Sequence, residues 1–526
     1  MHRILIADPL DGSGLEVFRE GGAELHLLAA DERLRLAELV GDFDALVVRS
    51  ATKVTAPLLA AGNRLRVVGR AGIGVDNVDV KAATERGILV VNAPTANALS
   101  ATEHTFALLL ALARNVPAAD ASLRRGEWER KRFVGVELQG KTLGVIGFGR
   151  IGQRVAKRAR AFEMAVVAYD PYLDAEAARR LDVELLALPE LLARADAVTL
   201  HTPLTEHTRG LLGAGELAAM KPGALLVNCG RGGVVDEAAL LAALDSGPLA
   251  GAALDVFAQE PPADFTLMRH PKVVATPHIG AQTREAQERI ATETARMVLA
   301  ALDGSLAVTA VNLPFAATGT RGEPYLALGE QLGRLAGALL GGGLAKIEVE
   351  LWGIEKGLQR PVVVSALKGA LSQALGGAIN YVNAERVAAG RGVEPVQVVR
   401  GESTDYPHLV GVRVEGDAGS FELAGFLFGE REPRVALFDG FPLEFRPTGR
   451  LLVLRNRDVP GVVGQLGTIL GEAGVNIADI HLARRDDAGE AVAVLRVEGE
   501  VAAATLEKVR ALDAVRSARV VDLDGA

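Results

Sequence analysis

The segment "KTLGVIGFGRIGQRVAKRARAF", residues 141–162, constrains the fold more than any other part of the sequence. An apolar run typical of a strand leads directly into Gly147, Gly149 and Gly152, and a helical pattern follows. The first glycine permits a tight turn, the second lets a pyrophosphate approach the backbone, and the third lets the helix pack on the strand. Asp170 ends the next predicted strand, where a carboxylate accepts hydrogen bonds from the ribose of NAD and repels the 2′-phosphate of NADP. The segment therefore predicts a dinucleotide-binding α/β unit that takes NAD.

Similar strand-like runs alternate with helical patterns through residues 1–300, among them "RILIAD", "ALVVRS", "LRVVGRA", "ILVVNAP", "AVTLHTP", "ALLVNCG" and "GAALDVF". Short runs that are apolar throughout are typical of strands buried on both faces, as in parallel sheets between helices. The class is therefore α/β and doubly wound.

Two stretches, residues 44–59 and 196–212, share an Asp-Ala start, an apolar strand and polar residues at the strand end. We interpret them as equivalent parts of two similar α/β domains that face each other. Because strand ends line the ligand crevice in such sheets, Arg49, Ser50, His201 and Thr202 are expected at a cleft between the domains.

The rest of the chain has a different pattern. Residues 283–304 have the apolar spacing of a helix that ends at Gly304. "TAVNLPF" is typical of a domain boundary, and the glycine-rich "LLGGGLA" separates two patterned segments after it. From Arg450 onward the pattern predicts the ferredoxin-like order βαββαβ.

The length and composition of the chain limit the classes of function that it can have. A chain of 526 residues is expected to form three or four domains, and a net charge of −9 gives no general attraction to nucleic acid or anionic membranes. No apolar run approaches the roughly 18 residues of a membrane-spanning helix, and "MHRILIADPL" does not resemble a signal peptide. The one cysteine, Cys229, can form no disulfide within the chain and no cysteine cluster for a metal. These features predict a cytoplasmic enzyme or regulator without a metal site.

Three polar residues near predicted strand ends suggest chemistry. Arg231 lies among glycines in "NCGRGGVVDE", where a guanidinium could bind a carboxylate or remain a surface charge. "ALDVFAQEPP" supplies Asp255 and Glu260, and His278 follows in "TPHIGAQT". A carboxylate that touches one imidazole nitrogen fixes its tautomer and lets the other nitrogen exchange a proton near neutral pH.

Together and in order, "GFGRIG", "HTPLTEHT", "NCGRGGVVDE", "ALDVFAQEPP" and "TPHIGAQT" resemble the D-2-hydroxyacid dehydrogenases. "VVRSATKVT", "VGRAGIGVDNVD" and "NALSATEHT" are similar to the phosphoglycerate dehydrogenase branch of that family. "NRDVPGVVGQLGTILGEAGVNIADI" resembles ACT regulatory domains, and "KGALSQALGGAINYVNAERVAAGRG" resembles the intervening domain of the long-chain members.

The resemblance implies four domains. A substrate-binding domain covers 1–98 and is completed by 283–312, and an NAD-binding Rossmann domain covers 99–282. Both have doubly wound parallel sheets. An α+β intervening domain covers 313–448, and a ferredoxin-like ACT domain covers 449–526. The branch resemblance implies oxidation of 3-phosphoglycerate with NAD in a homo-oligomer, either a dimer or a tetramer.

The resemblance also implies roles for individual residues. His278 would be the acid/base, Glu260 its partner, and Arg231 the anchor of the substrate carboxylate and carbonyl. The cofactor residues would be Gly147, Gly149, Arg150, Ile151 and Gly152 at the pyrophosphate, Asp170 at the ribose, and Thr202, Cys229, Asp255 and Gly280 on the nicotinamide side.

Arg49, Ser50 and Arg70 follow predicted strands, so all three are expected to reach one cleft and bind the substrate phosphate. Gly72 and Asn97 are predicted to line the same site. Arg130 lies in the basic stretch "RRGEWERKRF", which in the resembling family reaches across a dimer, so it would complete a neighbour's pocket. The alternative for this stretch is a solvated run of charge.

Two other functions stay open at this point. One is turnover of another D-2-hydroxyacid, of the 2-hydroxyglutarate or glyoxylate type. The other is a non-catalytic, NAD-sensing corepressor, as some relatives are. In the terminal domain, Asn456 and Asp458 are expected in the loop after the first strand and Asn476 at the start of the next strand. They would bind L-serine as an effector, unless the domain is a purely structural dimerisation module.

Overall fold

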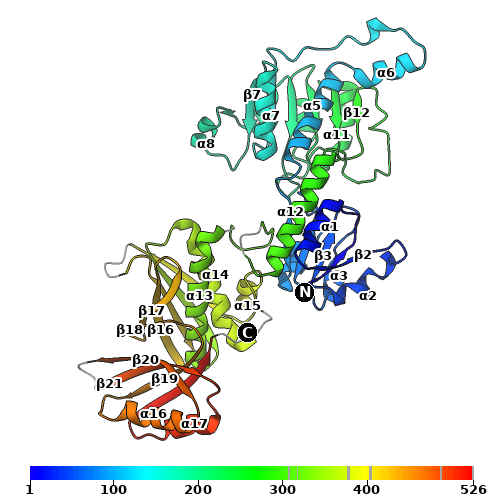
Figure 1. The fold of residues 1–526 in the computed structure, drawn as a ribbon. Coiled ribbons are helices and arrows are strands. Elements are labelled where there is room, and N and C mark those ends of the chain that lie inside the picture. Colours follow the sequence, from blue (N-terminus) through cyan, green and yellow to red (C-terminus); the bar gives the residue numbers. More distant parts are fainter. Residues whose placement is uncertain (306–308, 317, 376–378, 402–405, 486–488, 524–526) are drawn as a thin grey trace.

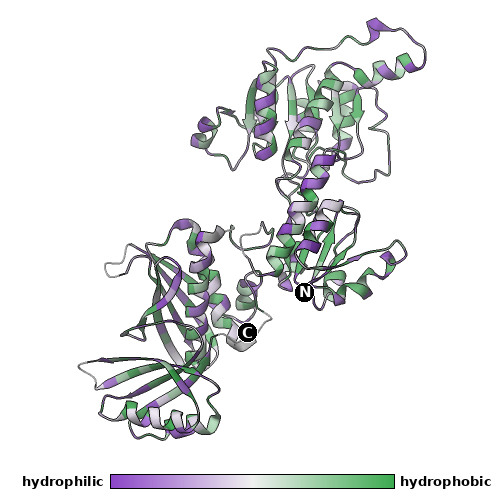
Figure 2. Cartoon of the chain, viewed as in Figure 1, coloured by the Kyte–Doolittle hydropathy of each residue, from purple (hydrophilic) through white to green (hydrophobic). Residues whose placement is uncertain are grey.

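The computed structural model describes residues 1–305, 309–316, 318–375, 379–401, 406–485 and 489–523 (Figure 1). In this part of the chain the strands form four sheets. Figure 2 shows that the strands of the first two sheets are hydrophobic along much of their length, whereas helices such as α7 have hydrophilic faces. The fold class predicted from the sequence is confirmed.

The first sheet is parallel and has the order β2-β1-β3-β4-β5. Its strands are β1 (Arg3–Ile6), β2 (Glu24–Leu27), β3 (Ala45–Val48), β4 (Val67–Arg70) and β5 (Leu89–Asn92). Around it lie α1 (Gly12–Glu20), α2 (Leu36–Leu39), α3 (Ala56–Ala61), α4 (Val80–Glu85) and the short turns η1 (Arg33–Arg35) and η2 (Val40–Asp42).

The long helix α12 (Arg284–Leu302) returns from the second sheet and packs on α1, β4 and β5 of the first. It begins where the Thr283 side chain accepts a hydrogen bond from the Ala286 N–H, and it ends before Gly304, whose φ is 85°. The helix predicted over 283–304 is confirmed within two residues at each end.

The second sheet is also parallel and has the order β12-β11-β10-β9-β6-β7-β8. Its strands are β6 (Thr142–Ile146), β7 (Ala165–Tyr169), β8 (Glu184–Leu185), β9 (Ala197–Leu200), β10 (Leu225–Asn228), β11 (Gly251–Leu254) and β12 (Val273–Ala275). Its helices are α5 (Ala98–Ala113), α6 (Val116–Arg124), α7 (Arg150–Ala161), α8 (Ala175–Arg180), α9 (Leu188–Arg194), α10 (Ala214–Ala218) and α11 (Glu237–Ser246). The strand order reverses between β6 and β9, which is where doubly wound sheets form their ligand crevice.

The two parallel sheets repeat one local arrangement, as the sequence predicted. Asp44 precedes β3, and its Oδ2 accepts a hydrogen bond from the Arg3 N–H at 2.8 Å. Asp196 precedes β9, and its Oδ2 accepts one from the Thr142 N–H at 2.9 Å. In each case the aspartate secures the start of the neighbouring strand, β1 or β6. The equivalence of residues 44–59 and 196–212 is therefore structural.

The third sheet is mixed, with the order β14-β13-β15-β16-β17-β18. It consists of β13 (Leu344–Trp352), β14 (Glu394–Arg400), β15 (Val410–Gly416), β16 (Gly419–Phe428), β17 (Glu432–Phe438) and β18 (Phe441–Phe445), and it packs with α13 (Gly319–Leu340), α14 (Lys356–Leu375) and α15 (Ala384–Gly390). Within this layer Lys368 contacts Glu330 at 2.5 Å and lies over the Tyr381 ring, so its charge is engaged inside the domain.

The fourth sheet is antiparallel, with the order β20-β21-β19-β22. In chain order the elements are β19 (Arg450–Arg457), α16 (Val462–Glu472), β20 (Asn476–Arg485), β21 (Glu490–Glu498), α17 (Ala503–Arg510) and β22 (Val515–Asp522). The predicted βαββαβ order is confirmed. One detail of the prediction is wrong: Asn456 lies in β19 and not in the loop, because the strand keeps its pairing with β21 through Arg457.

Among the described residues, no single helix has both the length and the apolar character to cross a membrane. The bent pair α5 and α6, with 63° between the helices, passes that test by length and composition alone.

Candidate active site

A cavity of about 470 Å³ lies between the ends of the strands of the first two sheets. It is lined by predicted substrate and catalytic residues from both, namely Arg49, Ser50, Arg70, Gly72, Asn97, Arg231, Glu260 and His278. A second cavity of about 210 Å³ shares Asn97, Arg231 and His278 with the first. It adds the predicted cofactor residues Ile151, Thr202, Cys229, Asp255 and Gly280, together with His201. The fold thus brings these separated motifs to one place.

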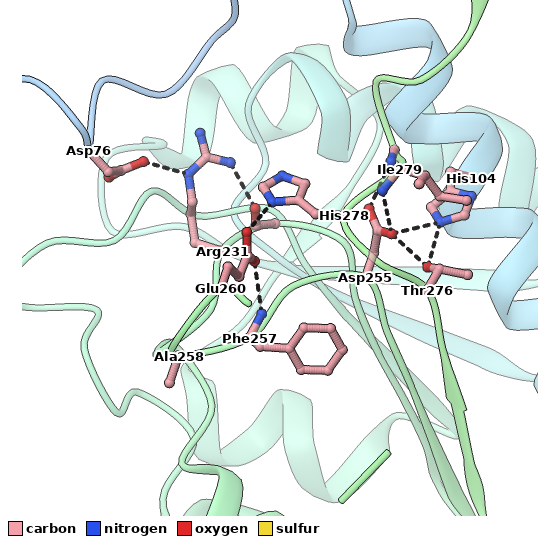
Figure 3. A network of polar contacts seen from close by, with 12 residues as sticks. Asp76, His104, Arg231, Asp255, Phe257, Ala258, Glu260, Thr276, His278 and Ile279 are labelled. Atoms are coloured by element: carbon pink, nitrogen blue, oxygen red, sulfur yellow. Dashed lines mark hydrogen bonds and ion pairs between the residues drawn. The ribbon is translucent and has the colours of Figure 1, made fainter. Parts of the chain in front are cut away.

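His278 and Glu260 form a hydrogen-bonded pair at the cavity wall (Figure 3). The Nδ1 of His278 lies 2.6 Å from one carboxylate oxygen of Glu260, and the other oxygen accepts a hydrogen bond from the Phe257 N–H at 3.0 Å. Burial tends to raise the pKa of Glu260, but these two hydrogen bonds outweigh it and hold the pKa below its usual value. The hydrogen bond at Nδ1 sets the tautomer of the His278 ring. The pair can therefore hold and release one proton.

Asp255 fixes the backbone on both sides of His278. Its Oδ1 accepts hydrogen bonds from the Thr276 hydroxyl at 2.6 Å and the Ile279 N–H at 2.8 Å, and its Oδ2 accepts one from the Gly280 N–H at 2.8 Å. Burial acts to raise the pKa of Asp255, yet its hydrogen bonds lower the pKa overall. Asp255 is therefore a buried anion that holds the loop, and Glu260 is the carboxylate that touches the ring.

Arg231 is presented by a turn that only glycine permits. Asn228 at the end of β10 donates a hydrogen bond from Nδ2 to the Arg231 carbonyl at 3.0 Å. A Cβ on Gly232 would lie 1.8 Å from the Phe257 carbonyl oxygen, so no other residue fits there without a shift of the backbone. The Nε of Arg231 donates to Asp76 at 3.1 Å, and this ion pair spans from the second sheet to a loop of the first. No local pattern in the sequence points to Asp76 as a partner of Arg231.

Arg49, Arg70 and Arg231 concentrate positive charge in the same cavity. Burial, together with the charges of Arg231 and Arg49, lowers the pKa of Arg70 to about 10, while Asp76 acts in the opposite direction. Gly72 has a φ of 151°, and a Cβ there would lie 1.6 Å from the Arg70 guanidinium. The arrangement is suited to an anion with more than one negative charge.

The turn that carries Arg49 is held by two residues that the sequence did not single out. Asp8 is buried, and its Oδ2 accepts hydrogen bonds from the N–H groups of Arg49 at 2.7 Å and Thr52 at 3.1 Å. Asn77 donates from Nδ2 to the carbonyls of the same two residues, each at 2.6 Å. Both backbone faces of the turn are thus fixed before any ligand binds.

The glycine turn has the geometry of a dinucleotide site. Gly147 has a φ of 89°, and a Cβ on it would lie 2.8 Å from the His201 carbonyl oxygen. A Cβ on Gly152 would lie 2.2 Å from the Gly147 carbonyl oxygen, whereas the space beside Gly149 is open. The carboxylate of Asp170 accepts a hydrogen bond from the Phe148 N–H within this turn at 2.8 Å, which places it beside the start of α7.

Three buried polar atoms in the smaller cavity have no hydrogen-bond partner among the described residues: Asn97 Oδ1, His201 Nδ1 and Thr202 Oγ1. An unpaired buried polar group costs about 1–3 kcal/mol, so such a group favours a polar ligand that pairs with it. Burial lowers the pKa of His201 to about 4 and raises the pKa of Cys229 to about 12. Both side chains are therefore neutral near pH 7, and the residues present fit a nicotinamide dinucleotide.

Arg130 and the three predicted effector residues lie away from both cavities and from the glycine turn. Arg130 is in the turn η3 (Arg130–Arg132), on the segment between α6 and β6 that extends from the second sheet (Figure 1). Asn456, Asp458 and Asn476 belong to the fourth sheet or its first loop. Asn456 is buried and its Oδ1 has no partner in the described part of the chain. Asp458 lies 3.8 Å from Arg484, and Asn476 donates to Glu498 at 2.8 Å. Within the described residues no group of three or more histidine, cysteine and acidic side chains is arranged to hold a metal ion.

The strand order, the glycine turn and the polar cleft between two parallel sheets are those of a dinucleotide-binding enzyme with a doubly wound fold. The family model for the NAD-binding domain of D-isomer specific 2-hydroxyacid dehydrogenases matches residues 106–280. The model for the D-3-phosphoglycerate dehydrogenase intervening domain matches 321–438, and the ACT domain model matches 450–514.

Curated relatives named D-3-phosphoglycerate dehydrogenase match over nearly the whole chain. The protein from Methanocaldococcus jannaschii is 42% identical over 99% of this chain and 100% of its own. That from Mycobacterium tuberculosis is 44% identical over 95% of each chain. Among solved structures, a glyoxylate reductase from Paecilomyes thermophila has a TM-score of 0.54 and 30% identity, and covers 59% of this chain and 98% of its own. The chain belongs to the D-3-phosphoglycerate dehydrogenase family and is a nicotinamide-dependent oxidoreductase.

Proposed function

We propose that this protein catalyses the NAD-dependent oxidation of 3-phospho-D-glycerate to 3-phosphohydroxypyruvate, the first committed step of L-serine biosynthesis. The observation that carries the proposal is the cavity that combines the pair His278–Glu260 with Arg49, Arg70 and Arg231. The substrate brings a carboxylate and a phosphate to this cluster, and the curated relatives carry the name of this activity. Those names do not favour the two alternatives, another D-2-hydroxyacid or a non-catalytic corepressor.

The arginines divide the two ends of the substrate between them. Arg231 holds the carboxylate from the cavity wall. Asp76 engages its Nε and the Gly230 carbonyl accepts a hydrogen bond from its Nη1 at 2.8 Å, so the Nη2 group is assigned to the substrate. Arg49 and Arg70 hold the phosphate with the Ser50 hydroxyl, and Gly72 and Asn97 line the same space. With both ends fixed, the carbon that reacts is confined next to His278, and such orientation lowers the barrier.

His278 moves the proton. In the oxidative direction the neutral ring takes the proton of the substrate hydroxyl, and Glu260 stabilises the imidazolium that forms. In the reductive direction the protonated ring returns that proton to the carbonyl oxygen. The nicotinamide, when bound, supplies the acceptor or donor of the hydride at the same carbon.

The cofactor is assigned to the cleft beside β6. Gly147, Gly149, Arg150, Ile151 and Gly152 would hold its pyrophosphate, and Thr202, Cys229, Asp255 and Gly280 would border the nicotinamide. Asp170 would bind the ribose, and its charge, already anchored by the Phe148 N–H, disfavours a 2′-phosphate. The cofactor is therefore NAD in preference to NADP.

The domain division 1–98 with 283–312, 99–282, 313–448 and 449–526 is also proposed, since each part corresponds to one sheet. We propose a homo-oligomer in which Arg130 of a second copy reaches the substrate site. The exposed Trp128 and Val134 beside Arg130 support an interface there. A cytoplasmic location is proposed because the one cysteine forms no disulfide within the chain.

The ACT domain is proposed to bind L-serine and slow the enzyme. Asp458 would pair with the amino group and Asn476 would hydrogen-bond to the ligand from a neighbouring copy. The unpartnered Oδ1 of buried Asn456 supports a polar ligand near the end of β19. Inhibition requires that serine bind one quaternary state better than another.

The test is oxidation of NADH with 3-phosphohydroxypyruvate by the parent and by the His278→Ala variant. General acid/base groups contribute about 10²–10⁴-fold in rate, so the variant should lose turnover by that factor while it still binds NADH. His26→Ala, on the outer strand β2, is the matched control and should turn over like the parent. A His278→Ala variant as fast as the parent would refute the assignment.

A further inference from the structure

We propose that His104 is a positioning residue for the acid/base: it holds the loop that carries His278 through Asp255 and Thr276. The inference rests on the proposed role of His278. His104 comes from α5, and its Nε2 lies 3.0 Å from the Thr276 hydroxyl oxygen and 3.2 Å from Asp255 Oδ1 (Figure 3). Within the described network it contacts neither Glu260 nor the His278 ring.

The donors and acceptors of this network determine how it works. The Thr276 hydroxyl donates to Asp255 Oδ1, so its oxygen is free to accept the Nε2–H of His104. Asp255 then receives the N–H groups of Ile279 and Gly280. Apart from Asp255 itself, His104 is thus the one side chain from outside the 276–280 loop that joins this arrangement in the described network.

The loop needs such support. His278 has a φ of 51°, a conformation that non-glycine residues adopt at a cost, and its side chain is 47% exposed. Glu260 fixes one ring nitrogen, which sets the direction of the ring but not the position of its backbone. Thr276 lies two residues before His278, and Ile279 and Gly280 are the two residues after His278. The contacts with Asp255 therefore hold the backbone on both sides of the ring.

The position also demands a particular length of side chain. The side chain of His104 is 15% exposed and that of Asp255 is 1% exposed. A Cβ on Gly280 would lie 3.1 Å from Asp255 Oδ2 and 3.8 Å from His104 Cδ2, so these three groups are already packed. A donor that stops short of Nε2 cannot reach Thr276 from α5. Glutamine places an N–H near the position of Nε2, whereas asparagine places it one bond nearer the backbone.

The matched variants His104→Gln and His104→Asn test the inference in the full-length protein with NADH and 3-phosphohydroxypyruvate. A shift of about 1 Å in a reacting group can cost up to about 10²-fold in rate. We expect His104→Asn to lower kcat about tenfold or more, with a smaller change in KM, and to raise the isotope effect on kcat with NADH deuterated at the transferred position. His104→Gln should recover most of the rate. A loss of stability alone would not alter the isotope effect, and thermal unfolding of all three proteins checks this.

An unchanged kcat and isotope effect in the His104→Asn variant would overturn the inference. Equal losses in the asparagine and glutamine variants would overturn it too, because the hydrogen bond to Thr276 would then not be the cause. Absence of turnover in the parent would instead refute the proposed function. In that case crystal structures of the parent and the His104→Asn variant test whether His104 positions the 276–280 loop. A displaced loop in the variant supports this role, and an unmoved loop contradicts it.

Discussion

Replacement of Glu260 by glutamine tests the proton-holding pair directly. The carboxylate lies 2.6 Å from His278 Nδ1, and its pKa is held low by the hydrogen bonds from that ring and from the Phe257 N–H in spite of burial. Glutamine keeps one oxygen for the Phe257 N–H but removes the charge. The protonated ring therefore loses its stabilising anion.

The magnitude follows from the geometry and the exposure. Hydrogen bonds to charged groups contribute about 1.5–3 kcal/mol when buried, and exposed ion pairs about 0.2–1 kcal/mol. The side chains of His278 and Glu260 are 47% and 35% exposed, so an intermediate value applies. About 1.4 kcal/mol corresponds to about a tenfold change in rate.

The rate depends on pH with opposite signs in the reductive and oxidative directions of the reaction. Reduction needs the protonated ring, so its rate is present at low pH and is lost as pH rises through the midpoint. Oxidation needs the neutral ring, so its rate appears as pH rises through the same midpoint. Glu260→Gln should move both midpoints to lower pH, because the protonated ring has lost the anion beside it. Reduction then becomes slower at a fixed pH near the midpoint, while oxidation reaches its plateau at a lower pH.

The assay is kcat/KM against pH in both directions for the parent, Glu260→Gln and Asp264→Asn. Asp264 is a carboxylate of the same loop whose hydrogen bonds go to Thr266, so its variant controls for a loss of charge nearby. Midpoints that stay in place in Glu260→Gln, or that move in opposite senses for the two directions, would refute the reasoning.

Three further outcomes are expected. Arg70→Ala should raise KM for 3-phosphohydroxypyruvate about tenfold or more and leave KM for an unphosphorylated oxo acid nearly unchanged. Gly72→Ala should have the same effect, because its Cβ would meet the Arg70 guanidinium. Equal effects on both substrates would exclude a role of Arg70 in binding the phosphate. Asp170→Ala should narrow the preference for NADH over NADPH in steady-state kinetics, and a parent enzyme that uses both equally would contradict the ribose assignment. Calorimetry should detect L-serine binding to the parent and weaker binding to Asn476→Ala, and no binding at millimolar serine would reject the effector site.

Local patterns made much of the fold predictable. Gly147, Gly149 and Gly152 must occupy fixed places in one turn. The structure explains Gly147 by its close approach to the His201 carbonyl after β9 and Gly152 by its close approach to Gly147, whereas the space beside Gly149 is open. The bounds of α12 follow from the Thr283 cap and from Gly304. The strands β2 and β8 gave no apolar signal, because they lie at or near sheet edges and carry polar residues such as Glu24 and Glu184.

Contacts between residues that are far apart along the chain could not be predicted from the sequence. Arg231 and Asp76 are 155 positions apart, and His104 and Thr276 are 172 apart, so neither pair leaves a local pattern. His104 stood inside the motif "NALSATEHT" without any sign of a special role. Asn456 was misplaced for a simpler reason: whether a strand ends before or after a polar residue depends on its partner strand.

The cluster of Arg49, Arg70 and Arg231 is proposed to select a phosphorylated substrate for reduction by NADH. The most direct measurement compares kcat/KM for 3-phosphohydroxypyruvate and hydroxypyruvate, which differ only in the phosphate group. Charged hydrogen bonds from Arg49 and Arg70, at about 1.5 kcal/mol each, predict a preference of about 100-fold for the phosphorylated compound. Equal values for the two compounds, or a preference for hydroxypyruvate, would show that these arginines do not select for the phosphate.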